Sequence, residues 1–508
     1  MTLELRPQAE AFEDLAIGTA PVNVAETNIA GKGLSVSDET TNLLGDAKAR
    51  LDIDPAKWRF EVGKEAYMIL VKAVPILIAS LLTNVTRYAT VFSLGRLGTK
   101  ELAACALAGV FEACSAISPF LGVLTALETL CSQAHTGSEN KHMLGIYLQR
   151  AITLQLISFV PIIWIWSYAE QILVAIGQNP EIAHMAGQFI IWSIPGVMSI
   201  ILAECVKKFL NAQGIMRASA YVSAITAPIS LVLFYFLVVN PPTSLGFIGA
   251  PIAAGITNFL SLILYVGYAI LIEGKQGWGG FSKEAFKGWW PFMKLGLPGM
   301  IMICSELWAF EIISLCASYL GTVALAAQSI IGTTLMLFIM VSLGITIAAC
   351  NRVGNLIGSA QPHRAALVAK ITLAMGTVIG VLNCTTVWAL RDSWGYMYNK
   401  NEEVVLFVSN ILPVVAIILL FQSMGGVCNG ILRGLGKQKV GAFIKVGSYY
   451  VVALPIGLLL TFYGGFGLKG LWMGIMSAYI VCFVLELIVV MRTDWNVEVR
   501  KCLHRISA

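Results

Sequence analysis

The chain has 508 residues, of which 57% are hydrophobic and only 12% are charged, and its formal net charge is +5. Soluble domains contain about 25% charged residues, and the mean hydropathy here is +0.77, so the composition excludes an ordinary soluble protein. The basic residues are spread over loops, which excludes a nucleic-acid-binding surface. The composition predicts an all-α polytopic membrane protein.

The first 63 residues are polar, mixed in charge and without hydrophobic periodicity, and they are predicted to form a disordered cytoplasmic tail. Within this tail, Glu39, Leu43 and Leu44 match an acidic dileucine sorting pattern, which would suit an endosomal or vacuolar address. Because the start of the chain is polar, we expect no signal peptide.

Apolar segments long enough to cross a bilayer, about 20 residues each, follow one another along the rest of the chain. Twelve are predicted, and they start near Tyr67, Leu102, Leu148, Ile182, Ala218, Phe247, Gly296, Val323, Leu367, Val404, Val440 and Gly465. Most loop lysines and arginines follow even-numbered spans. By the positive-inside rule both termini are therefore predicted to be cytoplasmic.

The spans form two similar halves. The pattern LGTxxLAA at residues 97–104 returns at residues 320–327, and the same shift carries Pro75 onto Pro298. Each half has an even number of spans, which predicts parallel repeats: an N-lobe with helices 1–6 at residues 64–274 and a C-lobe with helices 7–12 at residues 296–492. Residues 275–295 are predicted to be a cytoplasmic interfacial linker with an amphipathic helix, and residues 493–508 a cytoplasmic tail.

Two packed halves with a cleft between them are typical of a transporter. No phosphate-binding loop of the GxxxxGK[ST] type is present, which argues against direct use of ATP and favours an ion gradient. The eleven cysteines show no metal-ligand spacing and are expected to be buried, reduced thiols. We therefore expect neither a metal nor a cofactor, and no enzymatic activity.

The most informative residues are two carboxylates, Glu306 and Glu311, near the middle of the seventh span. A charge at this depth costs about 2.5–3.5 kcal/mol on insertion scales, so such a residue has a reason to be there. The two are five residues apart, which is roughly 140° around a helix, so they cannot share one narrow face. Either could bind a proton or a cationic substrate, and the alternative is a structural carboxylate.

Other ionisable residues within the spans are weaker candidates. Arg87 and Glu112 are predicted at similar depth in the N-lobe, where they would form a buried ion pair, or Arg87 would contact an anion or the substrate. Glu128 is expected to take part in gating or in a structural ion pair. The same expectation holds for Glu204, one turn from Lys207 and Lys208. Two further residues, Lys445 and Glu486, lie near span ends and are predicted to snorkel or to be paired.

Aromatic side chains could add a wall for a cationic ligand, and the candidates are Trp308, Tyr449 and Tyr450. Packing is the alternative role for each of them. Asn84 completes the N-lobe candidates, beside Arg87, Glu112 and Glu128.

Over residues 67–490, several segments resemble the eukaryotic branch of the multidrug and toxic compound extrusion (MATE) transporters, and the long polar tail resembles that of fungal members. The segments that carry the likeness are LGRLGTKELAACALA, ALETLCSQAHTG, LPGMIMICSELWAFEI, GITIAACNRVGNLIGS and GVCNGILRGLGKQKVGAFIKVGSYYVVALPIG. The resemblance implies twelve spans in two lobes that form a V-shaped cleft. It also implies alternating access and the export of small organic compounds, such as drugs, xenobiotics or secondary metabolites, in exchange for protons, with sodium as the less expected ion.

The same resemblance carries over individual residues. The working carboxylates of the seventh span fall on Glu306 and Glu311, and Glu128 matches the acid of the family's LETLC stretch. Acids that other members carry in the tenth and eighth spans are replaced here by Gln422 and Thr333. These losses, with Arg87 inside the first span, favour a neutral, zwitterionic or anionic substrate over a strongly cationic one.

The resemblance further implies an integral protein of the vacuolar or plasma membrane, in contact with membrane lipids and monomeric. Alternatives remain at this point. A lipid or anionic-metabolite transporter of the same superfamily would need a basic cleft, and a sodium-coupled exporter would need a sodium site. A major-facilitator protein would need a G-x3-[DE]-[RK]-x-G signature, which the loop HTGSENKHM lacks.

Overall fold

The computed structural model describes residues 55–507, and twelve helices in this range are long and apolar enough to cross a membrane, as predicted. A helix satisfies every backbone polar group within one segment, which lipid requires of a spanning structure. The predicted tail up to residue 54, with its dileucine pattern, lies outside the described residues. From Pro55 to residue 63 the chain is helical instead. Residues 61–507 form one compact unit.

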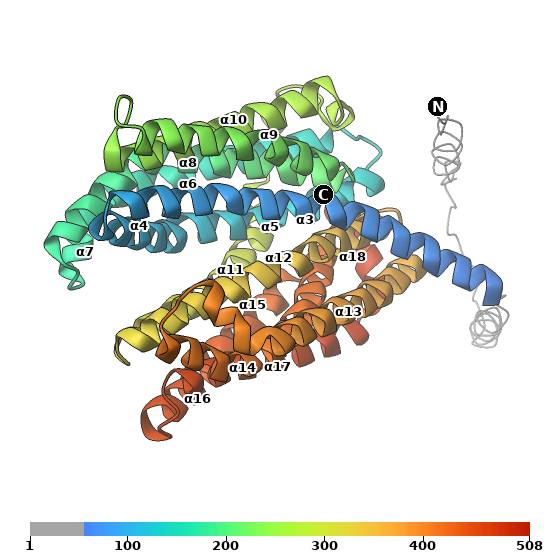
Figure 1. Cartoon of the computed structure of the whole chain (residues 1–508). Coiled ribbons are helices and arrows are strands. Elements are labelled where there is room, and N and C mark those ends of the chain that lie inside the picture. Colours follow the sequence, from blue (N-terminus) through green and yellow to red (C-terminus); the bar gives the residue numbers. More distant parts are fainter. Residues whose placement is uncertain (1–54, 508) are drawn as a thin grey trace, which may run out of the picture. The chain divides into compact units, whose positions relative to one another are not determined.

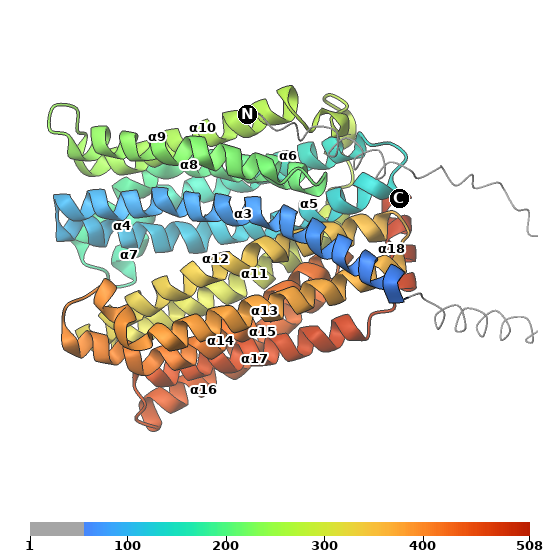
Figure 2. The same ribbon diagram turned by 45° about the vertical axis from the view of Figure 1, so that its right-hand side comes forward.

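The helices of each lobe lie side by side in both views (Figures 1 and 2). The N-lobe contains α3 (Pro55–Leu97), α4 (Thr99–Glu112), the π-helical turn η1 (Ala113–Ile117), α5 (Ser118–Gly137), α6 (Met143–Ser167), α7 (Ala169–Ala175), α8 (Pro180–Ala212), α9 (Arg217–Phe234), η2 (Tyr235–Val239), η3 (Gly246–Ile248) and α10 (Gly249–Leu271). The C-lobe contains α11 (Trp289–Ser318), α12 (Thr322–Gly358), α13 (Pro362–Trp394), η6 (Gly395–Met397), α14 (Glu402–Leu435), α15 (Gln438–Val446), the π-helical turn η7 (Gly447–Ala453), α16 (Leu454–Leu458), η8 (Leu459–Tyr463) and α17 (Leu468–Met491).

Helix α3 belongs to the cores of both lobes. Near its start, Ile69, Ala73 and Ile76 pack into the core that α12, α13 and α14 build in the C-lobe. Towards its end, Ala89 and Leu94 pack into the outer core of the N-lobe. The first span therefore joins the two halves along its own length.

The segment between the lobes differs from the prediction of an amphipathic helix. It contains only two short 3₁₀ turns, η4 (Lys275–Gly277) and η5 (Lys283–Phe286), and α11 already begins at Trp289. The reason lies in the glycines, because Gly274, Gly280 and Gly288 have φ values of 120°, 87° and 66°, which a helix does not allow. The linker is held instead by α6, where the Gln149 side chain donates to the Gly280 carbonyl at 2.8 Å.

The predicted C-terminal tail is a helix, α18 (Trp495–Ser507). It packs against α12 and α13 of the C-lobe and against α5 of the N-lobe. Val499 and Cys502 enter the C-lobe core, and burial raises the pKa of the Cys502 thiol to about 11. This thiol therefore stays protonated near neutral pH. The eleven cysteines all lie in the described range, and none forms a disulfide.

Contact between the lobes runs along α5, which packs against α11, α12 and α14. Small residues make this approach possible. A Cβ atom on Gly122 would collide with the Met300 backbone, and one on Gly299 would collide with the Thr125 side chain. Further along the interface, a Cβ atom on Gly358 would collide with the Gln133 carbonyl oxygen. The closed part of the interface is thus formed largely by backbone against backbone.

Candidate functional site

Glu306 lies in a cavity of about 190 Å³ inside the C-lobe, lined by residues of α11, α12, α14, α15 and α17. Its carboxylate forms an ion pair with the Lys445 ammonium group through Oε2, and its Oε1 accepts a hydrogen bond from the Tyr479 hydroxyl at 2.9 Å. The side chains of Lys445 and Glu306 are 11% and 25% exposed. Lys445, predicted to snorkel or to be paired, is therefore paired, and its partner is the candidate carboxylate.

Two tyrosines enclose this ion pair. The Lys445 ammonium lies 5.8 Å from the centre of the Tyr449 ring, and the rings of Tyr449 and Tyr479 meet edge to face at 5.9 Å. Tyr449 is fully buried. Its place follows from η7, the π-helical turn that widens α15 where the two consecutive tyrosines occur. Such turns are frequent at functional sites.

A second carboxylate, Glu486 of α17, lines the same cavity and is 1% exposed. It interacts electrostatically with Lys445 and Glu306 and contacts the Asn429 side chain. Its Oε1 has no hydrogen-bond partner among residues 55–507. Lys445 is thus paired with Glu306 and also interacts electrostatically with a second acid, Glu486.

Gln422 lines this cavity as well, and its Oε1 accepts a hydrogen bond from the Ser342 hydroxyl at 3.2 Å. Thr333, the other position where an acid was expected in the family, is half-buried, and its hydroxyl donates to the Ser329 carbonyl of its own helix. Because the lining around Gln422 is polar and neutral, the charged residues of the cavity are Glu306, Lys445, Glu486 and Arg433.

Trp308 and Tyr450 lie elsewhere, beside a second cavity of about 330 Å³ between α11, Tyr450 and Pro119 of α5. Met300, Ile301, Cys304 and Ser305 complete its lining, which holds no charged residue. The consecutive tyrosines therefore serve different cavities, Tyr449 the ion pair and Tyr450 the apolar space.

Glu311 lies apart from Glu306, as the angle between the two residues around the helix predicts. It is half-buried and interacts electrostatically with Cys114 in η1 of the N-lobe. Among residues 55–507 it makes no ion pair. It is thus a carboxylate at the junction of the lobes without a resident cation.

The predicted ion pair between Arg87 and Glu112 is absent from the described part of the chain, and that prediction is wrong. Glu112 is on the buried face of α4 and accepts a hydrogen bond from the Ser193 hydroxyl of α8. Arg87 lies on an exposed face of α3. The two side chains point in different directions, because Glu112 is buried and Arg87 is exposed. Asn84 donates to the Ser80 carbonyl of its own helix at 2.9 Å.

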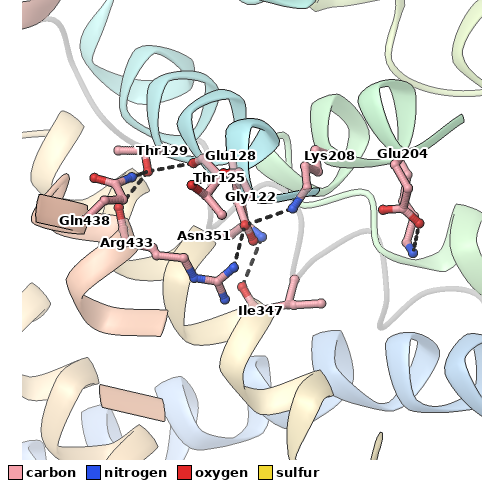
Figure 3. Close-up of polar contacts among 11 residues, drawn as sticks. Gly122, Thr125, Glu128, Thr129, Glu204, Lys208, Ile347, Asn351, Arg433 and Gln438 are labelled. Carbon is pink, nitrogen blue, oxygen red and sulfur yellow. Dashed lines mark hydrogen bonds and ion pairs between the residues drawn. The ribbon is translucent and has the colours of Figure 1, made fainter. Parts of the chain in front are cut away.

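Glu128, by contrast, is the centre of a contact between the lobes (Figure 3). Its Oε2 accepts from Lys208 of α8 at 3.2 Å and from Arg433 of α14 at 3.2 Å. Thr129 donates to the Arg433 carbonyl at 2.7 Å and accepts from the Gln438 amide at 2.6 Å. We call these five residues the interlobe cluster. Glu204 pairs nearby with Lys207 at 2.8 Å, as predicted.

Helix α18 supports the same contact. Arg505 donates to the Gln133 side chain at 2.7 Å, and Gln133 donates to the Gly434 carbonyl at 2.8 Å. The structure thereby connects the C-terminal helix to both lobes through one glutamine.

We expect Arg505→Ala to lower the free energy of unfolding by about 1.5–3 kcal/mol, the usual value of a hydrogen bond to a charged group. Thermal unfolding of the purified protein in detergent would measure this. The matched control is Arg391→Ala, which removes an exposed arginine beside Asp392 and should change the melting temperature little. Equal effects of the two substitutions would contradict the supporting role of α18.

Several residues of the cavity were not among the sequence candidates, notably Tyr479, Asn429 and Arg433. Tyr479 and Asn429 are ordinary residues of apolar spans, and nothing in their spacing distinguishes them. Arg433 could have been identified from the sequence, because it is an arginine within one of the twelve spans, α14.

The two parallel repeats with charged residues in the middle of their spans define a polytopic membrane transporter. A family model described as MatE matches residues 75–236 and again residues 298–459. An uncharacterized transporter of Schizosaccharomyces pombe is 34% identical over 490 residues, which cover 96% of this chain and 90% of the relative. Multidrug and toxin extrusion protein 1 of Xenopus tropicalis is 32% identical over 86% of this chain and 76% of its own length.

The crystal structure of the eukaryotic MATE transporter AtDTX14 superimposes with a TM-score of 0.83 at 26% identity, covering 88% of this chain and all of that one. The chain belongs to the MATE family of multidrug and toxin extrusion transporters. It is an integral multi-pass membrane protein and not an enzyme.

Proposed function

We propose that this protein exports small organic compounds in exchange for protons by alternating access, with Glu306 as the main proton site. The observation that supports this most directly is the Glu306 carboxylate, held by Lys445 and Tyr479 inside the C-lobe cavity. A proton on Glu306 neutralises one partner of the ion pair, so Lys445 turns to Glu486, the second acid within its reach. Proton binding thereby rearranges the cavity without leaving an unpaired ammonium group.

One further point supports this coupling over sodium. A sodium site needs several oxygen ligands around a vacant position, and an ammonium group already occupies the position next to Glu306. With Glu306 compensated in this way and Gln422 uncharged, the C-lobe cavity carries little net attraction for a cationic compound.

The apolar cavity beside Trp308 and Tyr450 supports a neutral or zwitterionic aromatic cargo, since aromatic and aliphatic side chains form its walls without a charge. Glu311, about one helical turn beyond Trp308, supplies a carboxylate for a polar or basic group of such a cargo. An anionic metabolite is the second candidate, and the exposed Arg87 is the observation in its favour. By the positive-inside rule the interlobe cluster and both termini face the cytoplasm, and the membrane is the vacuolar or the plasma membrane.

Transport into proteoliposomes with an acidic lumen tests the proposal. Rhodamine B and rhodamine B ethyl ester are a matched pair of probes, the first zwitterionic and the second cationic. We expect gradient-driven uptake of rhodamine B to fall in Glu306→Gln by about tenfold or more, since each tenfold requires only about 1.4 kcal/mol. Glu311→Gln should keep the response to the gradient while changing the preference between the two dyes.

Glu306→Asp, which keeps the carboxylate, is the control and should retain part of the uptake. If Glu306→Gln keeps full gradient-driven uptake, the proposed proton site is wrong. If a sodium gradient drives wild-type uptake and a pH gradient does not, the proposed coupling ion is wrong.

A further inference from the structure

We propose that Arg433 is a positioning residue that couples the protonation of the C-lobe cavity to the separation of the two lobes. This inference rests on the proposed function, because it describes how a proton bound in one lobe changes the contact with the other.

Arg433 belongs to two sites at once. It lines the C-lobe cavity together with Glu306, Lys445 and Glu486. On the other side its Nη1 donates to Glu128 of the N-lobe at 3.2 Å, as Figure 3 shows. The side chain is only 10% exposed. Within residues 55–507 no other arginine lines this cavity and also pairs with a carboxylate of the N-lobe.

The charges on either side of Arg433 alternate in sign. In spatial order the members are Glu306, Lys445, Glu486, Arg433, Glu128, Lys208, Glu204 and Lys207. The series starts in the cavity of the C-lobe, crosses to the N-lobe between Arg433 and Glu128, and ends on α8. It contains as many carboxylates as cations, so it is electroneutral only when every carboxylate is ionised.

A proton bound in the cavity breaks this balance. When Glu306 is protonated, Lys445 turns to Glu486, and Arg433 loses the attraction of that carboxylate. The three cations Arg433, Lys208 and Lys207 then share the two carboxylates of Glu128 and Glu204, so one positive charge is no longer compensated. A surplus cation away from water is unfavourable, and separating the lobes allows water to reach these side chains. Protonation in the C-lobe therefore weakens the interlobe cluster.

All groups that face Arg433 enter this balance. They are Glu128 of α5, Cys350 of α12 and Glu486 of α17, with Lys208 of α8 bound to the same carboxylate. Apart from the thiol, each of them belongs to the alternating series. Protonation thus favours separation of the lobes at the interlobe cluster. This direction of coupling suits an exchanger, because the proton-loaded protein must open towards the side where the proton is released.

Cys350 offers a direct readout of the separation. It is fully buried, and its thiol lies against the Glu128 carboxylate. Labelling of the full-length protein in proteoliposomes with N-ethylmaleimide, quantified at Cys350 by mass spectrometry, follows the opening of the contact. Each value is divided by the labelling of denatured protein at the same pH, which removes the effect of pH on thiol reactivity. Cys131, fully buried in the N-lobe core, is the control for unfolding.

We expect wild-type labelling at Cys350 to rise several-fold from neutral to mildly acidic pH, while Cys131 stays unlabelled. Arg433→Lys, which keeps the cation, should retain this rise. Arg433→Gln should show high labelling that no longer depends on pH. Glu486→Gln, which leaves the pair between Arg433 and Glu128 in place, should raise labelling at neutral pH and flatten the pH profile.

The proposal is overturned if Arg433→Gln and Glu486→Gln both keep the wild-type pH profile, or if wild-type labelling does not depend on pH. Labelling of Cys131 in Arg433→Gln would show that this variant is unfolded. In that case the pH profile of Glu486→Gln alone tests the proposal. Dye uptake in the same vesicles separates this inference from the proposed function. Loss of gradient-driven uptake in Glu306→Gln, combined with a wild-type pH profile in the other two variants, overturns the role of Arg433 and leaves the proton site standing.

Discussion

Replacing Lys445 by methionine is expected to abolish proton-driven transport and to lower the free energy of unfolding by about 3 kcal/mol. Removing one partner of a buried ion pair usually costs about 3–5 kcal/mol, because the other charge is left uncompensated. The lower end applies here, since the Glu306 side chain is 25% exposed to the cavity. Thermal unfolding in detergent and dye uptake into proteoliposomes would measure the two effects.

The double variant Lys445→Met with Glu306→Gln distinguishes the lost charge balance from lost packing. Without the carboxylate, the methionine leaves no uncompensated charge, so most of the stability should return while transport stays absent. A double variant as unstable as Lys445→Met alone would show that the ion pair is not the reason for the loss. The size of the recovery is the coupling between the two residues.

The second large effect is expected at Glu65, near the start of α3. Its carboxylate accepts from Arg352 of α12 at 2.7 Å and from Arg364 of α13 at 2.6 Å, and its side chain is 3% exposed. Glu65→Gln leaves two guanidinium groups facing a neutral amide. We expect the free energy of unfolding to fall by about 3 kcal/mol, the lower end of the range for a broken buried pair, because Arg364 is 45% exposed and can turn to water.

Glu181→Gln provides a matched control, because Glu181 also pairs with one cation at 2.6 Å but is 61% exposed. Exposed pairs contribute only about 0–1 kcal/mol, so this variant should unfold at nearly the wild-type temperature. A Glu65→Gln protein as stable as Glu181→Gln would mean that packing alone holds the start of α3 on the C-lobe.

The number of spans and their repeat could be predicted because both depend on patterns along the chain. The position of Glu306 within its span was predicted for the same reason. Its partner, Lys445, is 139 residues away, and such a pairing depends on how helices pack. The depth of a residue in the membrane follows from its place in the apolar run, whereas the direction of its side chain follows from tertiary contacts. This difference explains why the pair between Arg87 and Glu112 was predicted and does not form.

Local backbone geometry accounts for the other differences. Residues 275–295 have a composition typical of an interfacial helix, but Gly280 and Gly288 interrupt it with positive φ, as Gly274 does just before it. The sequence predicts that the two consecutive tyrosines belong to one aromatic wall. The π-helical turn that carries them directs Tyr449 to the ion pair and Tyr450 to the apolar cavity, and hydrophobic periodicity does not report such a turn.

The contact between the lobes also determines what its opening requires. Three hydrogen bonds between the lobes have a backbone carbonyl as acceptor. Thr129 donates to the Arg433 carbonyl, Gln133 to the Gly434 carbonyl and Thr136 to the Asn355 carbonyl. A carbonyl that loses such a donor needs another partner, and only water can reach all three when α5 moves away. Opening at this end is therefore a hydration step. The closed form is the dry form, so the equilibrium between the two forms depends on the activity of water as well as on protons and cargo.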